Sequence, residues 1–364
     1  MEYDVILRNG NVYGGGMYLL RNVDLAIKDG KIAKLDKFIE GTAKQEYNIA
    51  GKMVSPAFSD VISCDMEQAE EIITKSLEHG TTTVKYEMFA DGVWKDEDFR
   101  KLSALKEKFA TKICIKTVVP YIPTYDSKWR GAAEQGLVDF VGACIGGLDE
   151  SIIDSVFVLA KEYHLPIEVG VDFTNEPNID RFLYIIEKTI EEQMQGMVTC
   201  DHVTALDAEG LDTIEAAIAV ARCARARVNV VSMTSEDMHN TCWERRGTTK
   251  VRDLLDAGVS VAIASGRKQS SVCPFGNGSL LEEALLTAQV HKFTTHPEFS
   301  KVYEMITYNP AENMLLENYG TNVGCVADLL VLEAPDATEA ILDKANVTYV
   351  FKAGSLVARD QKIV

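Results

Sequence analysis

Two side chains of this sequence could carry catalytic chemistry, the thiol of Cys64 and the imidazole of His202. A thiolate beside an imidazole is a nucleophile with its base, and the same two groups are ligands for zinc. Cys64 can equally be a buried, inert thiol, and His202 can be an imidazole held by a neighbouring hydrogen bond. The residue types leave both alternatives open.

Charged residues also fall near the ends of strand-like segments. Lys85 and Glu87 close the segment 81–87, and Lys116 lies within 113–120. They could clamp a charged ligand, or they could pair with one another as an internal salt bridge. Trp94, Tyr121 and Trp129 fall in segments that we expect to be loops, where they could form a ligand platform or pack in the core.

Strand and helix patterns alternate through the middle of the chain. Apolar segments at 113–120, 167–171, 198–202, 228–233 and 259–265 predict strands, and the amphipathic stretches 97–109, 151–164 and 180–194 predict helices between them. This regular alternation favours a parallel α/β fold, and the number of repeats fits a closed (β/α)8 barrel over residues 56–317.

The two ends of the chain are different. Residues 1–55 and 318–364 contain short strands and turns, among them a hairpin at Asp29-Gly30. Neither end has enough strands for a stable sheet alone. We therefore expect both ends to combine in one small composite β domain, a β-sandwich beside the barrel.

Composition narrows the class of protein. The formal net charge of -18 disfavours nucleic acid and anionic membranes as partners. The eight cysteines are scattered without CxxC spacing, which favours free thiols in a reducing compartment. The N-terminus lacks the pattern of a signal peptide, and no apolar run is long enough to span a membrane, so we expect a cytoplasmic protein.

The order of motifs resembles the amidohydrolase superfamily, and within it the cytosine deaminase-like group. The matching segments cover nearly the whole chain: Gly51-Lys-Met-Val-Ser-Pro-Ala-Phe58, His79-Gly-Thr-Thr-Thr-Val-Lys85, Asp201-His202-Val-Thr-Ala-Leu206, Arg245-Arg-Gly-Thr-Thr-Lys250, Pro274-Phe-Gly-Asn-Gly278 and Thr307-Tyr-Asn-Pro-Ala-Glu312. Each is weak alone, but together they imply the metal-dependent hydrolase kind of barrel.

The departures from that family concern its chemistry. The resemblance implies metal ligands at four positions and a catalytic glutamate at a fifth. These positions hold Ile62, Cys64, Gly170, Gly266 and, in place of the glutamate, Phe173. The side chains of isoleucine and glycine donate nothing to an ion, and phenylalanine cannot transfer a proton. We expect a degenerate metal site and no cofactor, unless zinc or iron binds a site rebuilt from Cys64 and His202.

The remaining residues at the barrel mouth favour a site that binds a ligand over a site that catalyses a reaction. The resemblance places His202 toward substrate and Asp172 beside the missing glutamate. With Phe173, Lys85 and Ile62, they are the candidate pocket residues. We expect a non-catalytic homologue that binds a small heterocycle, and a homo-oligomer is compatible with the sequence. Two alternatives stay open: a metal-independent hydrolase of C–N bonds that uses Cys64 and His202, and a conventional metal-dependent deaminase.

Overall fold

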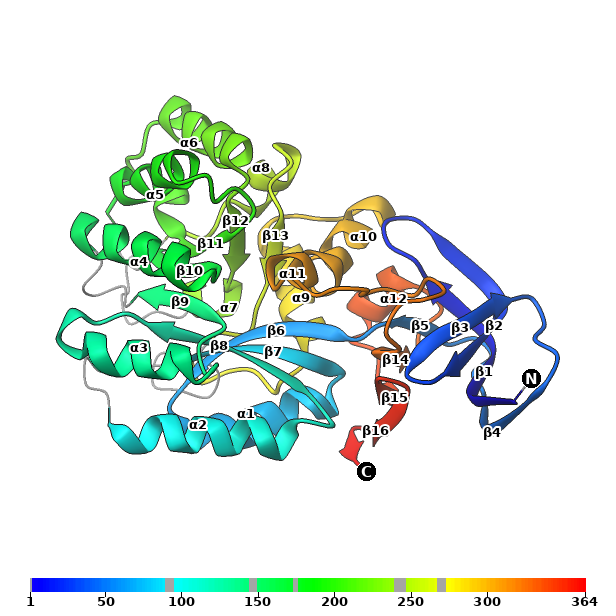
Figure 1. Ribbon diagram of the computed structural model, residues 1–364. Coiled ribbons are helices and arrows are strands. Elements are labelled where there is room, and N and C mark those ends of the chain that lie inside the picture. The colour runs from blue at the N-terminus through cyan, green and yellow to red at the C-terminus, as the bar shows by residue number, and fades with distance from the viewer. Residues whose placement is uncertain (1, 89–94, 144–148, 173–175, 239–246, 267–272) are drawn as a thin grey trace.

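The computed structural model describes residues 2–88, 95–143, 149–172, 176–238, 247–266 and 273–364. Two bodies lie side by side in Figure 1, a barrel and a mixed sheet that holds both chain ends. No helix in the described ranges is both long and apolar enough to cross a bilayer.

Eight parallel strands form the barrel, paired in the order β6 to β13 along the chain. They are β6 (Phe58–Cys64), β7 (Thr81–Met88), β8 (Cys114–Pro120), β9 (Phe140–Ala143), β10 (Ile167–Asp172), β11 (Val198–Val203), β12 (Asn229–Ser232) and β13 (Val261–Ile263). Their near-continuous burial is typical of parallel strands that are covered by helices.

The first and last barrel strands meet through a short contact. A parallel bridge joins Ile62 to Gly266, with backbone hydrogen bonds of 3.2 Å from Ser63 and 3.1 Å from Gly266. Beside it, the buried Asp60 carboxylate accepts hydrogen bonds from the backbone N–H and the hydroxyl of Ser265. The barrel predicted from the alternating pattern is confirmed.

Helices follow the strands and cover the outside of the barrel (Figure 1). They are α1 (Met66–Glu78), α2 (Asp96–Phe109), α3 (Asp126–Glu134), α4 (Glu150–Tyr163), α5 (Asp180–Glu191), α6 (Thr213–Ala226), α7 (Thr234–Met238), α8 (Val251–Asp256), α9 (Leu280–Val290), α10 (His296–Glu304) and α11 (Tyr308–Asn313), with short 3-10 turns η1 (Pro123–Tyr125) and η3 (Thr204–Asp207).

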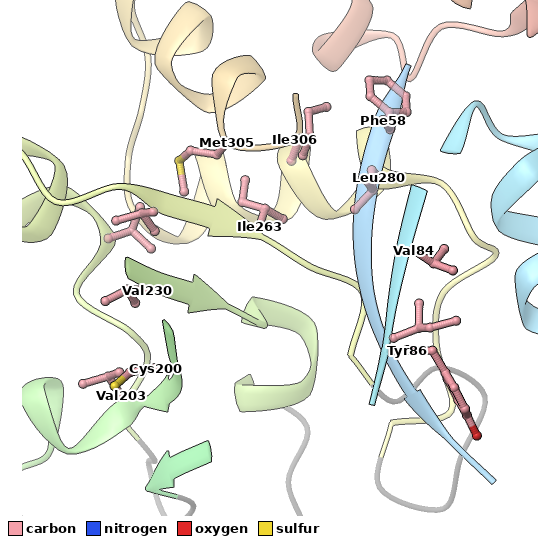
Figure 2. Close-up of a cluster of buried hydrophobic side chains, with 14 of the residues drawn as sticks. Phe58, Val84, Tyr86, Cys200, Val203, Val230, Ile263, Leu280, Met305 and Ile306 are labelled. Atoms are coloured by element: carbon pink, nitrogen blue, oxygen red, sulfur yellow. The ribbon is translucent and has the colours of Figure 1, made fainter. Parts of the chain in front are cut away.

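The largest apolar core lies between strands and helices. Figure 2 shows part of it, with Phe58, Val84 and Ile263 from the strands near Leu280 of α9. A smaller cluster lies on the other face of β6, β12 and β13: Val61, Val231, Met233, Ala262, Ala264 and Met314. Side chains on successive strand residues point to opposite faces, so β6, β12 and β13 contribute to both clusters.

Trp129 belongs to the core rather than to the mouth of the barrel. It lies in α3, not in the loop that the sequence suggested, and it is fully buried. Its indole N–H donates a 3.0 Å hydrogen bond to the carbonyl of Val119. The core alternative is therefore correct for this residue, Tyr121 packs against it edge to face, and Trp94 lies outside the described residues.

Both chain ends build one nine-stranded mixed sheet, as expected. Its strands are β1 (Glu2–Tyr13), β2 (Leu19–Lys28), β3 (Lys31–Asp36), β4 (Thr42–Asn48), β5 (Met53–Pro56), β14 (Leu329–Leu332), β15 (Val347–Lys352), β16 (Ser355–Arg359) and β17 (Lys362–Ile363), and α12 (Ala337–Leu342) packs nearby. The domain boundaries at residues 55 and 318 stay a prediction.

Local sequence explains the hairpin between β2 and β3. Asp29 and Gly30 have φ angles of 49° and 75°, the left-handed conformation at both positions that a two-residue type I′ turn needs. The register then pairs Lys28 with Lys31 and brings the apolar side chains of Leu25 and Ile27 into the core of the sheet.

Candidate functional site

The first barrel strand turns the two candidate metal positions away from the barrel interior. Ile62 and Cys64 belong to the same apolar core as Tyr86, whose hydroxyl donates a 2.9 Å hydrogen bond to the Cys64 carbonyl. The neighbouring Val61 belongs to the smaller cluster and pairs in register with Lys85. Because strand side chains alternate, residues 62 and 64 face the helices.

Cys64 is therefore held in an apolar setting. Its side chain is buried, and burial, with a smaller contribution from the carboxylate of Asp65, raises the pKa of the thiol to about 12. A thiol with this pKa stays protonated near neutral pH, whereas nucleophilic attack and metal binding both require the thiolate. Six of the eight cysteines lie in the described ranges, and all six are free thiols.

A salt bridge crosses the barrel interior. Lys85 of β7 donates to the Glu168 carboxylate of β10, and both side chains are almost completely buried. The Lys85 ammonium also lies 4.6 Å from the centre of the Phe140 ring. Burial raises the pKa of the Glu168 carboxyl, and Lys85 offsets only part of that rise. Lys116 instead lies 3.8 Å from Asp139.

His202 stands at the end of β11 in a strained conformation. Its φ angle is 51°, in the left-handed region that non-glycine residues seldom adopt and that occurs often at functional sites. The imidazole is buried, and its Nδ1 lies 3.0 Å from a carboxylate oxygen of Asp237. Its Nε2 lies 3.9 Å from the nearest carboxylate oxygens of both Asp201 and Glu236.

These carboxylates determine the charge of His202. Burial alone would lower the pKa of the imidazole, but the charge of Glu236 and the hydrogen bond to Asp237 outweigh it and raise the pKa to about 9. Burial also raises the pKa of Asp201 well above its usual value, and the charges of Glu87, Glu168 and Glu236 add to the rise. At neutral pH the cluster thus holds an imidazolium beside a carboxyl group with high proton affinity.

Glu236 occupies the space beside Gly266. A Cβ atom at position 266 would lie 2.4 Å from a carboxylate oxygen of Glu236 and 3.0 Å from the sulfur of Met233. Gly266 also has a φ angle of 60°, which strains any other residue. The structure therefore has no room for a side chain at position 266 while Glu236 keeps its place.

Glu236 and Asp237 are site residues that the sequence analysis missed. Both lie in the short helix α7, directly after β12, and both are buried. Both carboxylates come directly after a barrel strand, at the C-terminal face. Barrels of this kind have their active sites at that face. The signal was therefore the pair of acidic residues after the apolar segment 228–233.

The fifth strand, β10, leads toward an open, acidic cavity. Gly170 pairs with Asp201, and Asp172 ends the strand and is 6% exposed. Asp172 lines a cavity of about 370 Å³, and Arg181 donates a 2.7 Å hydrogen bond to the backbone carbonyl of Val171 there. The other cavity residues are Asp149, Glu150, Ile153, Glu176, Asn178, Asp180 and Tyr184. Phe173 lies outside the described residues.

We expect that removing one partner of the buried salt bridge destabilises the fold strongly, whereas replacing both partners with apolar side chains destabilises it much less. Lys85→Met alone, or Glu168→Gln alone, should lower the free energy of unfolding by about 3–5 kcal/mol, because each leaves a buried polar group without its partner. The double variant Lys85→Met/Glu168→Met should recover most of this loss. Urea unfolding measures all three.

Lys44→Met is the matched control, since Lys44 forms an exposed salt bridge with Asp4. Removing that bridge should leave the free energy of unfolding nearly unchanged, because water and salt screen an exposed pair. Losses of the same small size for both Lys85 and Glu168 would contradict the assigned burial of the pair.

His202 should make stability depend on alkaline pH. Its folded pKa of about 9 lies above the value of about 6.5 for an unfolded chain. The imidazolium therefore stabilises the fold fully below pH ~6.5, and this contribution, on the order of 3 kcal/mol, disappears as the pH rises through about 9. The difference in unfolding free energy between the wild type and His202→Gln should shrink across this range. A difference that stays constant from pH 6 to 10 would be inconsistent with a charged His202.

Comparison with known proteins places these features in a family. The model of the amidohydrolase family matches residues 64–357. An N-isopropylammelide isopropyl amidohydrolase from Pseudomonas sp. (strain ADP) is 26% identical and aligns over 100% of this chain and 99% of its own. A pterin deaminase from Rhizobium rhizogenes is 23% identical over 77% of this chain and 67% of its own.

Solved structures show the same fold. The 5-methylcytosine deaminase from Klebsiella pneumoniae, liganded with phosphonocytosine, has a TM-score of 0.87 and 20% identity, and the match covers 97% of this chain and 98% of that one. N-isopropylammelide isopropylaminohydrolase from Burkholderia multivorans has a TM-score of 0.85 and 20% identity, with 99% of both chains covered. The fold and the match over most of its length show that this chain belongs to the amidohydrolase family.

Proposed function

We propose that this chain is a cytosine deaminase-like amidohydrolase homologue that has lost its metal centre and its catalytic glutamate, and that it binds a small heterocycle. The observation that carries the proposal is the relation between Gly266 and Glu236. Position 266 offers no ligand, and the Glu236 carboxylate takes the space that a ligand side chain there would need.

The other family positions support the same conclusion. Ile62 has no donor atom, and Gly170 has no side chain. Cys64 is protonated near neutral pH, and its side chain belongs to the core that faces the helices. Among the residues that the structure describes, no three His, Cys, Asp or Glu side chains are arranged to hold a metal ion. The residues present thus do not fit the metal group that the family implies.

The loss of the acid follows from residue type. Phe173 stands where the family motif has glutamate, and it cannot accept or release a proton. General acid–base transfer is typically worth ~10²–10⁴ in rate, so its removal alone would leave little turnover.

The ligand class follows from the relatives and from the mouth of the barrel. The proteins reported above are named for N-isopropylammelide, 5-methylcytosine and pterin, which are all nitrogen heterocycles. The strained His202 imidazolium is the polar group that we assign to ligand contact, because its Asp237 partner fixes the orientation of the ring. Lys85 forms a salt bridge with Glu168, so we do not assign it a direct contact with the ligand.

A metal-independent hydrolase remains the second candidate, favoured by one observation. Asp201 has a strongly raised pKa and lies 3.9 Å from Nε2 of His202, and such pairs handle protons in many active sites. In this reading His202 and Asp201 act without Cys64, whose high pKa makes it a poor nucleophile.

The purified protein should contain only substoichiometric zinc, iron and manganese, even after expression in metal-supplemented medium. It should also release no ammonia from cytosine or isocytosine above background. Elemental analysis and an ammonia assay measure these two properties. One tightly held metal per chain would overturn the loss of the metal centre, and ammonia release that His202→Ala abolishes would establish a working deaminase.

Heterocycle binding should appear in a thermal-shift screen of purines, pyrimidines and triazines. A ligand at 100 times its Kd stabilises the folded state by about 2.7 kcal/mol. We expect this stabilisation to vanish in His202→Gln. It should persist in the control variant His296→Ala, because His296 lies on α10 and contacts Thr338 rather than the cluster around His202. No stabilisation by any compound would refute the proposed binding role.

A further inference from the structure

Helix α6 exposes an apolar stripe on the outer surface of the barrel. Ile214 and Ile218, one turn apart, are 69% and 47% exposed. Ala217 and Ala221 are also exposed and continue the same side of the helix. Residues spaced by three and four positions share one face, so these four residues form a single strip, which we call the α6 stripe.

The opposite face of α6 is equally apolar. Ala216, Ala219, Val220, Cys223 and Ala226 are buried against the barrel. A helix that is apolar on both faces is usually covered on both faces, whereas a surface helix normally presents polar residues to water. Single exposed apolar residues are common on protein surfaces, but a contiguous strip that contains large isoleucine side chains indicates a surface that another molecule covers.

The neighbouring helix extends this surface. Arg222 of α6 donates a 3.2 Å hydrogen bond to Glu187 of α5, so the two helices lie side by side. Ile190, one turn beyond Glu187, is 43% exposed. Figure 1 shows α5 and α6 on the part of the barrel away from the mixed sheet, so the chain ends do not cover them.

Charge along α6 points to the identity of the partner. Asp212 caps the start of the helix and Glu215 lies in its first turn, whereas Arg222 and Arg225 lie near its end. If a second α6 packs antiparallel, the acidic start of each helix meets the basic end of the other. A surface that matches itself in this way suits an isologous, two-fold contact.

We propose that the α6 stripe is a homodimer interface, in which α6 packs antiparallel against α6 of a second copy about an axis between Ile218 and Ala221. The small side chains of Ala217 and Ala221 allow the helices to approach closely. The overall charge of -18 repels a second copy, but at physiological salt this repulsion is screened beyond about 8 Å. The local charge pairs then decide the contact.

The expected affinity follows from the size of the surface. Stable interfaces bury about 800 Å² per partner, and a helix of 14 residues is about 21 Å long. One helix supplies only part of that area, even with Ile190 added. We therefore expect a dimer with a dissociation constant on the order of micromolar, rather than an obligate one.

Sedimentation equilibrium of the full chain tests this proposal. The wild type should dimerise over the micromolar range, and Ile218→Asp should raise the dissociation constant about 100-fold, because it buries a charge at the centre of the stripe. Leu342→Asp is the matched control, since Leu342 is 49% exposed but lies on α12. The dimer of this variant should have the same dissociation constant as the wild-type dimer.

Charge reversal tests the antiparallel arrangement. Glu215→Arg and Arg225→Glu should each weaken the dimer, and the double variant should restore it, because the pairs re-form with opposite sign. Circular dichroism should show unchanged folding in every variant. A wild type that stays monomeric to several hundred micromolar, or a dimer that Ile218→Asp leaves intact, would overturn the interface. Failure of the double variant to recover would overturn the antiparallel pairing.

Discussion

The salt bridge between Lys85 and Glu168 is a constraint on which the barrel interior depends, because neither buried charge can lose its partner cheaply. It joins strands β7 and β10 across the inside and places a cation and a carboxylate where water does not reach. In such surroundings each further charge acts strongly on its neighbours. Glu168 adds to the raised pKa of Asp201, after burial and the charge of Glu87, whereas Glu236 and Asp237 are the main groups that keep His202 protonated. The buried pair thus contributes to the charge of the cluster around His202 without setting it.

Glu236 shows how one side chain limits what the end of the eighth strand can carry. The barrel still joins β13 to β6 through Gly266, and the carboxylate beside that glycine comes from α7 rather than from the eighth strand. An aspartate at position 266 would require Glu236 to move as well. Fold similarity at TM-scores above 0.8 therefore says little about this site.

The barrel and the joint sheet could be predicted because they depend on regular patterns. Alternating apolar segments indicated parallel strands, and the Asp29-Gly30 turn indicated its hairpin. The site was harder, because it depends on contacts between residues distant in sequence. Lys85 and Glu168 are 83 residues apart, and nothing local pairs them. The direction of Ile62 depends on the register of β6, where a shift of one residue exchanges the two faces of the strand.

The mixed sheet also has a consequence for the order in which the chain is made. Strand β5 pairs with β1 on one side and with β14 on the other, so it is the seam between the earliest and latest segments. A ribosome delivers residues 2–56 long before residues 329–363, and domains generally fold as units during synthesis. The barrel can form first, while the edge of β5 that later pairs with β14 is still unpaired. Completion of the sheet thus requires the segment that carries β14, and any pause before that segment is synthesised lengthens the exposure of that edge.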